Sequence, residues 1–221
     1  MGPRTEHARG RKRDSDATRA ALLDAARDLF GRHGYNTVTL RDIGERAGAD
    51  GSLVARYFGN KAALYQSAVA EDSREVTVSP EPFDLDAFTA HALRRADERG
   101  APGPLVQAVL SQGTAPEVRA SAADELRTRL ISPLATRLAA EGADDPVARA
   151  EVLISCLVGV IALRSSGQFD GLSAMSPEAI GTILESAAQA PTSTTPPVSP
   201  ANDSTTSVQD SPDQPETPQR F

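Results

Sequence analysis

Residues 39–61 read TLRDIGERAGADGSLVARYFGNK, and this stretch decides the fold of the N-terminal part of the chain. The Thr39 hydroxyl can cap a short helix, and Gly48 can end that helix after about two turns. The inward-facing positions of this helix are Leu40, Ile43 and Ala47. A second short helix is predicted from about Gly51 to Phe58. Two short helices joined by a tight turn have the layout of a helix-turn-helix, whose second helix can enter a major groove roughly 12 Å wide.

A longer helix is predicted before this stretch. Its apolar stripe consists of Leu22, Ala26, Leu29 and Phe30. We expect it to begin at Asp16 or Thr18 and to stop at Gly34. Residues 1–16 are polar and include RGRKR at 9–13, so we expect a disordered basic arm there. The arm is either a tail without a role or a flexible extension that adds phosphate or minor-groove contacts.

Helical patterns fill the rest of the chain as far as residue 190, with glycine and proline between them. They cover about 60–75, 84–99, 104–112, 116–140, 145–165 and 176–189, and no segment alternates as a strand does. Residues 191–221 contain 7 Pro and 11 Ser/Thr, which predicts a disordered tail. The fold class is therefore all-α: a helix-turn-helix domain over 17–63, a second helical domain over 64–190 and the tail.

The charge of the chain is divided unevenly along its length. The formal net charge is -7, but residues 1–61 contain 12 Lys/Arg and 8 Asp/Glu, a net +4. The remaining residues contain 11 Lys/Arg and 22 Asp/Glu, a net -11. This asymmetry suits a protein that meets a polyanion at its N-terminal end and is repelled from it elsewhere.

Other classes of protein find little support in the sequence. The longest apolar run, from Val152 to Leu163, is shorter than the roughly 20 residues that span a bilayer, so we expect a cytoplasmic protein with no membrane contact. The lone Cys156 lies in an apolar helix pattern and is expected to be a buried structural thiol. The three histidines are His7, His33 and His91. Because they are scattered and no metal spacing or phosphate loop appears, we expect no enzyme, no cofactor and no metal.

Residues 20–69 resemble the DNA-binding domain of the TetR/AcrR family. The motifs that carry the resemblance are Ala25-Ala26, Leu29-Phe30, Gly34-Tyr35, Thr39–Ile43, Ala47-Gly48 and Tyr57-Phe58-Gly59-Asn60-Lys61 with Leu64. The resemblance implies a transcriptional regulator, usually a repressor, that binds double-stranded operator DNA. It also implies a homodimer on a palindromic site and release by a small-molecule effector, whose identity the sequence does not indicate.

The resemblance further implies which residues contact DNA. It assigns phosphate contacts to Thr39 and Arg41 and backbone clamps to Tyr57 and Lys61. The residues on or near the base-facing side are Asp50, Gly51, Ser52, Leu53, Ala55 and Arg56. Thr39 and Arg41 can instead be a helix cap and a surface ion pair, and Arg56 can read guanine or bind phosphate. Many family members have Tyr where this chain has Ala55, so we expect few base contacts and a larger share of shape readout.

Two further sites are expected in the second domain. The predicted dimer interface consists of Leu153, Leu157, Val160, Ile161, Ile180 and Leu184; the alternative is that both helices only close the core of one chain. The predicted effector pocket consists of Phe88, Val106, Leu110, Leu126, Leu130 and Leu134, each of which can equally be plain core.

A second reading of the whole chain is a helical protein-interaction module with a purely structural helix-turn-helix. Such a module would show no salt-dependent affinity for DNA, whereas a regulator would.

Overall fold

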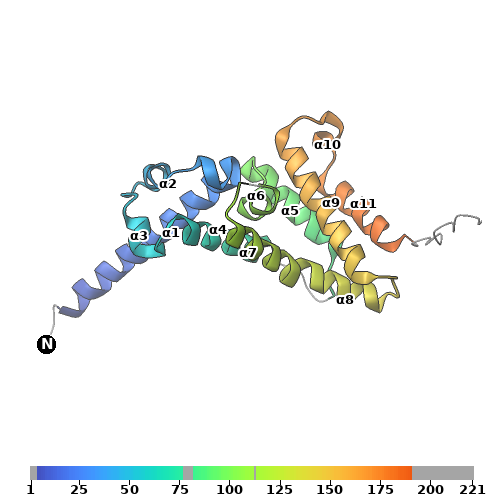
Figure 1. The fold of residues 1–221 in the computed structure, drawn as a ribbon, viewed down its shortest axis with the longest axis horizontal. Coiled ribbons are helices and arrows are strands. Elements are labelled where there is room, and N and C mark those ends of the chain that lie inside the picture. The colour runs from blue at the N-terminus through green and yellow to red at the C-terminus, as the bar shows by residue number, and fades with distance from the viewer. Residues whose placement is uncertain (1–3, 77–81, 112, 191–221) are drawn as a thin grey trace, which may run out of the picture. The chain divides into compact units, whose positions relative to one another are not determined.

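The computed structural model describes residues 4–76, 82–111 and 113–190, and within these ranges it contains helices and turns but no strand. The elements are α1 (Arg4–Thr37), α2 (Leu40–Ala47), α3 (Leu53–Phe58), α4 (Lys61–Val76), α5 (Leu85–Arg99), α6 (Pro104–Leu110), α7 (Pro116–Leu126), the π-helical turn η1 (Arg127–Ile131), α8 (Ser132–Ala140), α9 (Pro146–Ser166), α10 (Asp170–Ala174) and α11 (Pro177–Gln189) (Figure 1). The predicted all-α class is confirmed. The predicted tail over 191–221 lies outside the described residues.

The start of α1 differs from the prediction. The helix begins at Arg4 rather than at Asp16 or Thr18. The disorder expected of the arm stays a prediction. The Thr18 hydroxyl donates to the carbonyl of Asp14 at 2.8 Å, a bond typical of a helix interior rather than of an N-cap. The Arg, Lys and Ala residues of this segment are good helix formers, which favours continuation of the helix toward the N-terminus. The predicted stop is found at Gly34, whose φ of 73° departs from the helical conformation.

Both ends of α2 are closed by local bonds. The Thr39 side chain accepts a hydrogen bond from the backbone N–H of Asp42, and the Asp42 carboxylate accepts one from the backbone N–H of Thr39 at 2.8 Å. This capping box satisfies two N–H groups that the first turn leaves without a helical partner. Gly48 ends the helix with a left-handed φ of 64°, as the sequence predicts.

The turn between α2 and α3 depends on two glycines. A Cβ atom on Gly44 would lie 2.6 Å from the backbone nitrogen of Gly51 and 2.8 Å from the carbonyl oxygen of Ala49. A Cβ atom on Gly51 would lie 2.5 Å from the carbonyl oxygen of Leu40. The missing side chains therefore allow the start of α3 to lie directly against the backbone of α2.

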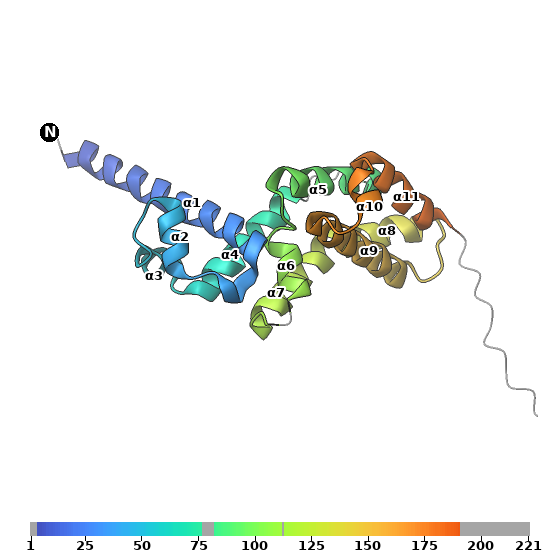
Figure 2. The same ribbon diagram turned by 90° about the horizontal axis from the view of Figure 1, so that it is seen from above.

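Two clusters of buried apolar side chains form the core. The first contains residues of α1 to α4 together with Leu105, Ala108, Val118 and Ala122 from α6 and α7. The second contains residues of α5, α6, η1, α8, α9 and α11. Figures 1 and 2 show α2 and α3 beside α1 and α4, whereas α8, α9 and α11 lie together elsewhere. Because α6 and α7 cover the first cluster, the helix-turn-helix core includes residues beyond 63, where the predicted domain ended.

The predicted helix over 116–140 is interrupted by the π-helical turn. The backbone N–H of Ser132 donates to the carbonyl of Arg127, five residues earlier, which marks η1. Leu126, just before the turn, packs against both apolar clusters. The short α10 was not predicted, because Gly167 and Gly171 indicated only a loop.

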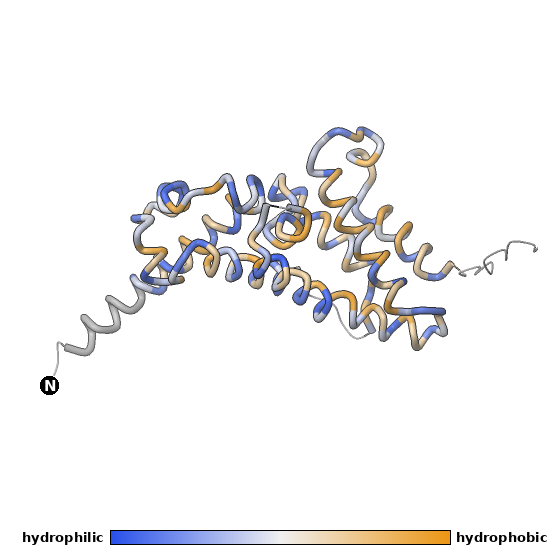
Figure 3. Tube along the Cα trace, in the orientation of Figure 1, coloured by the Kyte–Doolittle hydropathy of each residue, from blue (hydrophilic) through white to orange (hydrophobic). Residues whose placement is uncertain are grey.

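Helix α9 carries apolar residues along much of its length (Figure 3). Among the described residues it is the one helix that, with 21 residues, is long and apolar enough to cross a membrane by length and composition alone. The expectation from the sequence rests on the shorter apolar run within this helix. One such helix is weak evidence for a membrane span, because core helices of soluble proteins meet the same criterion. Leu153, Leu157 and Ile161 of α9 lie in the second core cluster.

The close approach at Gly44 gives a test of the fold. We expect Gly44→Ala to lower the free energy of unfolding by about 1–3 kcal/mol, because the added methyl group meets rigid backbone. Gly171→Ala is the control, since a Cβ there meets nothing within 4 Å. This variant should be neutral or gain up to about 1 kcal/mol. Urea unfolding followed by circular dichroism measures both, and equal stabilities would contradict the packing described.

Candidate functional site

Helix α3 is anchored on one side and exposed on the other. Val54 is fully buried, and Leu53 packs against the first core cluster. Ser52, Ala55 and Arg56 are exposed. Of these three side chains, only Arg56 has the forked donors that can bind the edge of a guanine or a phosphate.

Thr39 and Arg41 both have partners within the chain. Thr39 is the cap of α2, and the Arg41 Nε atom lies 2.8 Å from Glu45 Oε1. The Arg41–Glu45 pair is exposed on both sides, and such pairs contribute little to stability. Arg41 can therefore exchange Glu45 for a phosphate at small cost. A phosphate contact by either residue stays a prediction.

Three of the residues predicted to face bases have structural roles in the turn. The Asp50 carboxylate accepts a hydrogen bond from the backbone N–H of Ser52 at 2.8 Å, and this bond lowers the pKa of Asp50. Gly51 permits the close approach to α2, and Leu53 contributes to the core. The side chains that remain available for base edges are those of Ser52, Ala55 and Arg56, a sparse set.

Tyr57 and Lys61 are both half-buried at the end of α3 and the start of α4. The Tyr57 hydroxyl accepts a hydrogen bond from the Ser15 hydroxyl of α1 at 3.3 Å, and the guanidinium of Arg56 lies 5.6 Å from the Tyr57 ring centroid. The Lys61 ammonium lies 4.4 Å from the ring centroid of Tyr35. Burial lowers the pKa of Lys61. The charge of Asp42 acts on Lys61 against the effect of burial, but neither Lys61 nor Arg56 forms a salt bridge with a carboxylate among the described residues.

The predicted effector pocket is partly matched by a cavity of about 40 Å³. Its lining includes Phe88, Val106, Leu126 and Leu130, but not Leu110 or Leu134. Leu110 is 49% exposed at the end of α6, and Leu134 is fully buried in the core, so the effector pocket stays a prediction. The cavity is small beside the roughly 300–1,000 Å³ typical of ligand sites.

The predicted dimer residues lie on the inner side of their helices. Those in the core of the single chain are Leu153, Leu157, Ile161, Ile180 and Leu184, and Val160 is partly buried against them. Their assignment to a dimer interface stays a prediction. Side chains buried within one chain have little surface left for a partner, and helix α9 is apolar on more than one side, so its period did not show which side is inward. The outer side carries Val152 at 62% exposure, Leu163 at 46% and, on α11, Ile183 at 55%. Cys156 also lies on the exposed side, so its predicted burial is wrong for the single chain.

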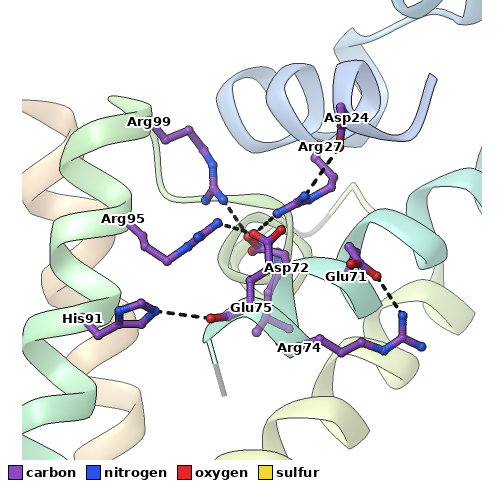
Figure 4. Close-up of polar contacts among 10 residues, drawn as sticks. Asp24, Arg27, Glu71, Asp72, Arg74, Glu75, His91, Arg95 and Arg99 are labelled. Atoms are coloured by element: carbon purple, nitrogen blue, oxygen red, sulfur yellow. Dashed lines mark hydrogen bonds and ion pairs between the residues drawn. The ribbon is translucent and has the colours of Figure 1, made fainter. Parts of the chain in front are cut away.

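A cluster of charged side chains between α1, α4 and α5 was not predicted (Figure 4). Glu75 Oε2 accepts from both Arg27 and Arg95, and Arg99 lies 2.8 Å from the buried Asp72. Burial would raise the pKa of Glu75, but the hydrogen bond and charge of Arg27 outweigh it and lower that pKa. The spacing of these residues in the sequence could have indicated the cluster. Arg95 and Arg99 are four residues apart on one helix, and Asp72 and Glu75 are three residues apart on another, so each pair lies on one helix face.

The two short helices, their glycine turn and the exposed Arg56 define a helix-turn-helix protein. The chain belongs to the TetR family of bacterial regulatory proteins: that family's model matches residues 22–68, and the model of the tetracyclin repressor-like C-terminal domain matches residues 86–190. In the part of the chain that the structure covers, no group of His, Cys, Asp and Glu side chains could hold a metal ion.

Three known proteins illustrate the relationship. An HTH-type transcriptional repressor of Streptomyces coelicolor is 30% identical over 101 residues, which are 46% of this chain and 52% of that protein. The HTH-type transcriptional regulator YdeS of Bacillus subtilis is 29% identical over 136 residues, 61% of this chain and 66% of that protein. The match thus spans about half of one relative and just under two thirds of the other.

The third is a solved structure, NalD of Pseudomonas aeruginosa, described as the secondary repressor of a multidrug efflux pump. It shares the fold with a TM-score of 0.54 at 19% identity, over 79% of this chain and 95% of that chain.

The contribution of the capping box of α2 to stability can be tested by changing the pH. The backbone and side chain of Thr39 lower the pKa of Asp42, so its carboxylate stabilises the folded chain above the unfolded pKa of about 3.9. This effect is lost as the pH falls below that value and through the lower pKa of the folded chain. We expect wild type to be more stable than Asp42→Asn near neutral pH, with the difference shrinking as the pH falls from about 5 to about 3. Urea unfolding across this range measures it, and a difference independent of pH would contradict the capping box.

Proposed function

We propose that this protein is a ligand-responsive transcriptional repressor that binds a palindromic operator as a homodimer in the cytoplasm. The observation that carries the proposal is the exposed Arg56 on a short helix whose opposite side is anchored by the buried Val54. A rigid short helix with an unpaired guanidinium on its outer side suits the major groove. Membership of a family of transcriptional regulators supports the proposal, and the proposal requires no catalytic activity.

Few base contacts are available to one such helix. Ala55 offers only a methyl group and Ser52 one hydroxyl, so a single domain reads a short stretch weakly. Two domains on a two-fold axis double the contacts and require a palindromic site with a fixed spacing of half-sites. The proposal therefore needs a dimer interface.

The outer side of α9 is the best candidate for that interface. Val152, Cys156, Gly159 and Leu163 follow one another at helical spacing along it, and the first and last are large apolar side chains exposed to solvent. A Cβ on Gly159 would meet nothing within 4 Å, so the backbone of a partner helix can approach closely there. Ile183 of α11 adds a further exposed apolar side chain. Burial of such a surface drives association.

Repression follows from the simplest use of such a dimer. A dimer seated on a promoter blocks polymerase without further contacts. The relative from Streptomyces coelicolor is itself named a repressor. An effector would release the DNA by binding better to a conformation in which the two recognition helices are wrongly spaced, since only differential affinity shifts such an equilibrium.

Arg56 provides the test of DNA binding. Sheared DNA of the source genome is incubated with the full chain, the retained fragments are sequenced, and the affinity for the recovered site is measured at several salt concentrations. We expect a palindromic site, and we expect Arg56→Ala to lower the affinity by about 10- to 100-fold, or 1–3 kcal/mol. Arg119→Ala, which removes an exposed arginine from α7, should leave the affinity unchanged.

Two outcomes separate the readings. If Arg56 reads a base, the loss is largest for the recovered site; if it binds phosphate, the loss is similar for all sequences and the salt dependence falls. Weak, sequence-blind retention by the wild type, indifferent to salt, would favour the protein-interaction module instead.

Val152 tests the interface. A glutamate at this position places like charges against each other across a two-fold axis, so we expect Val152→Glu to be monomeric in sedimentation velocity at concentrations where wild type is dimeric. Leu110→Glu, at another exposed apolar position, should remain dimeric. A dimeric Val152→Glu variant would move the interface away from this side of α9.

A further inference from the structure

The small cavity has an unusual wall for an apolar space. Most of its lining is aliphatic or aromatic and comes from α5, α6, α9 and the α7–η1 region. Three charged residues also line it: Asp72, Arg95 and Arg99. Glu75, outside the lining, pairs with both Arg27 and Arg95. The whole cluster therefore has three guanidinium groups and two carboxylates, a net +1 before the exposed Asp24 is counted.

Asp72 is already fully engaged. One of its oxygens lies 2.8 Å from Arg99, and the other accepts from the backbone N–H of Leu105 at 3.3 Å. The residue is 2% exposed. Gly103 closes over the pair, since a Cβ there would lie 2.8 Å from Asp72 Oδ2. Asp72 therefore neutralises Arg99, and among the described residues no hydrogen bond or ion pair joins it to Arg95.

Arg95 is only partly satisfied. It shares one oxygen of Glu75 with Arg27, so two guanidinium groups compete for a single acceptor atom (Figure 4). The Nε atoms of Arg27 and Arg95 are buried and have no hydrogen-bond partner among the described residues. The exposed Asp24 lies 3.7 Å from Arg27 and adds little, because its charge is screened by water.

A buried N–H group without an acceptor is costly, and a carboxylate is the acceptor that matches a guanidinium best. The Nε atom of Arg95 thus lacks an acceptor beside an apolar cavity, in a cluster with one excess positive charge. We propose that the effector site takes an organic anion: a carboxylate that binds Arg95, attached to an apolar body that lies between α5, α6 and α9. The role of this acid as an effector rests on the proposed function, whereas its binding does not.

This binding would act on the link between α4 and α5. The ligand's carboxylate takes Arg95 in place of Glu75, so one ion pair that holds α4 against α5 is lost. Because the cavity holds only about 40 Å³, the apolar body fits once these helices have moved apart. Such a ligand binds the separated arrangement better than the one described, which is the condition for a shift in population. Helix α4 begins at Lys61, next to the recognition helix.

The test measures binding to the full chain without DNA. Butyrate, octanoate and dodecanoate are titrated calorimetrically, with octanamide and octanol as uncharged counterparts and inorganic phosphate as an anion without an apolar body. We expect octanoate or dodecanoate to bind at least about tenfold more tightly than octanamide and than phosphate, since charge-assisted hydrogen bonds are the stronger kind.

Substitutions then locate the carboxylate. Arg95→Gln should bind octanoate no better than octanamide, and Arg95→Lys, which keeps the charge but loses the forked donors, should retain part of the preference. Arg94→Gln is the matched control: the neighbouring side chain is exposed, pairs with Glu178 on α11 and does not line the cavity. It should bind as wild type does, and circular dichroism verifies that all variants are folded.

Several results would overturn the proposal. Equal affinity for octanoate and octanamide, a preference that survives in Arg95→Gln, phosphate binding as tightly as the acids, or no binding up to the solubility limit each exclude it. The proposed function fails separately: a wild-type chain that binds no specific DNA site without any added ligand is not an operator-binding repressor, whichever acids it binds.

Discussion

The charged cluster at the C-terminal end of α4 is the interaction on which the remaining arrangement depends. It joins α1 and α4 of the first core cluster to α5 of the second through two carboxylates and three guanidinium groups. Partly buried charges are stable only while their partners are in place, because each has given up hydration. Loss of one partner therefore leaves the remaining charges uncompensated, which disfavours movement of α4 away from α5 as long as nothing replaces that partner.

The parts of the fold that follow from local bonds were predictable. The ends of α2 depend on Thr39, Asp42 and Gly48, all within ten residues of one another, and their residue types are those that caps require. The charged cluster was not predictable in the same way, because Arg27, Asp72 and Arg95 meet only after the chain has folded. The dimer residues were hard to select for another reason. Helix α9 is apolar on both its inner and outer sides, so periodicity identified the helix and left its orientation open.

The recognition helix shows how scaffold and readout compete for the same few residues. Of the positions expected to face DNA, Asp50, Gly51 and Leu53 are occupied by the turn and the core. A six-residue helix cannot both bury enough surface to be held in place and expose many long polar side chains. For the proposed operator binding, this leaves one strong donor, Arg56, and selectivity would then draw on the shape of the groove and the spacing of half-sites.

The π-helical turn η1 has a consequence for the long helical segment that contains it. Val118 and Ala122, before the turn, belong to the first core cluster, whereas Leu130 within the turn and Leu134 and Leu138 after it belong to the second. In an unbroken α-helix, residues four apart drift by about 40° around the axis, so a fixed four-residue spacing winds away from any single neighbour. The wider π-helical turn shifts the angular position of the side chains where the segment passes from one core cluster to the other. The side chains before and after the turn are thus rotated relative to each other about the helix axis, so that each part of the segment faces its own core cluster. The extra residue of the turn sets the angle of this rotation.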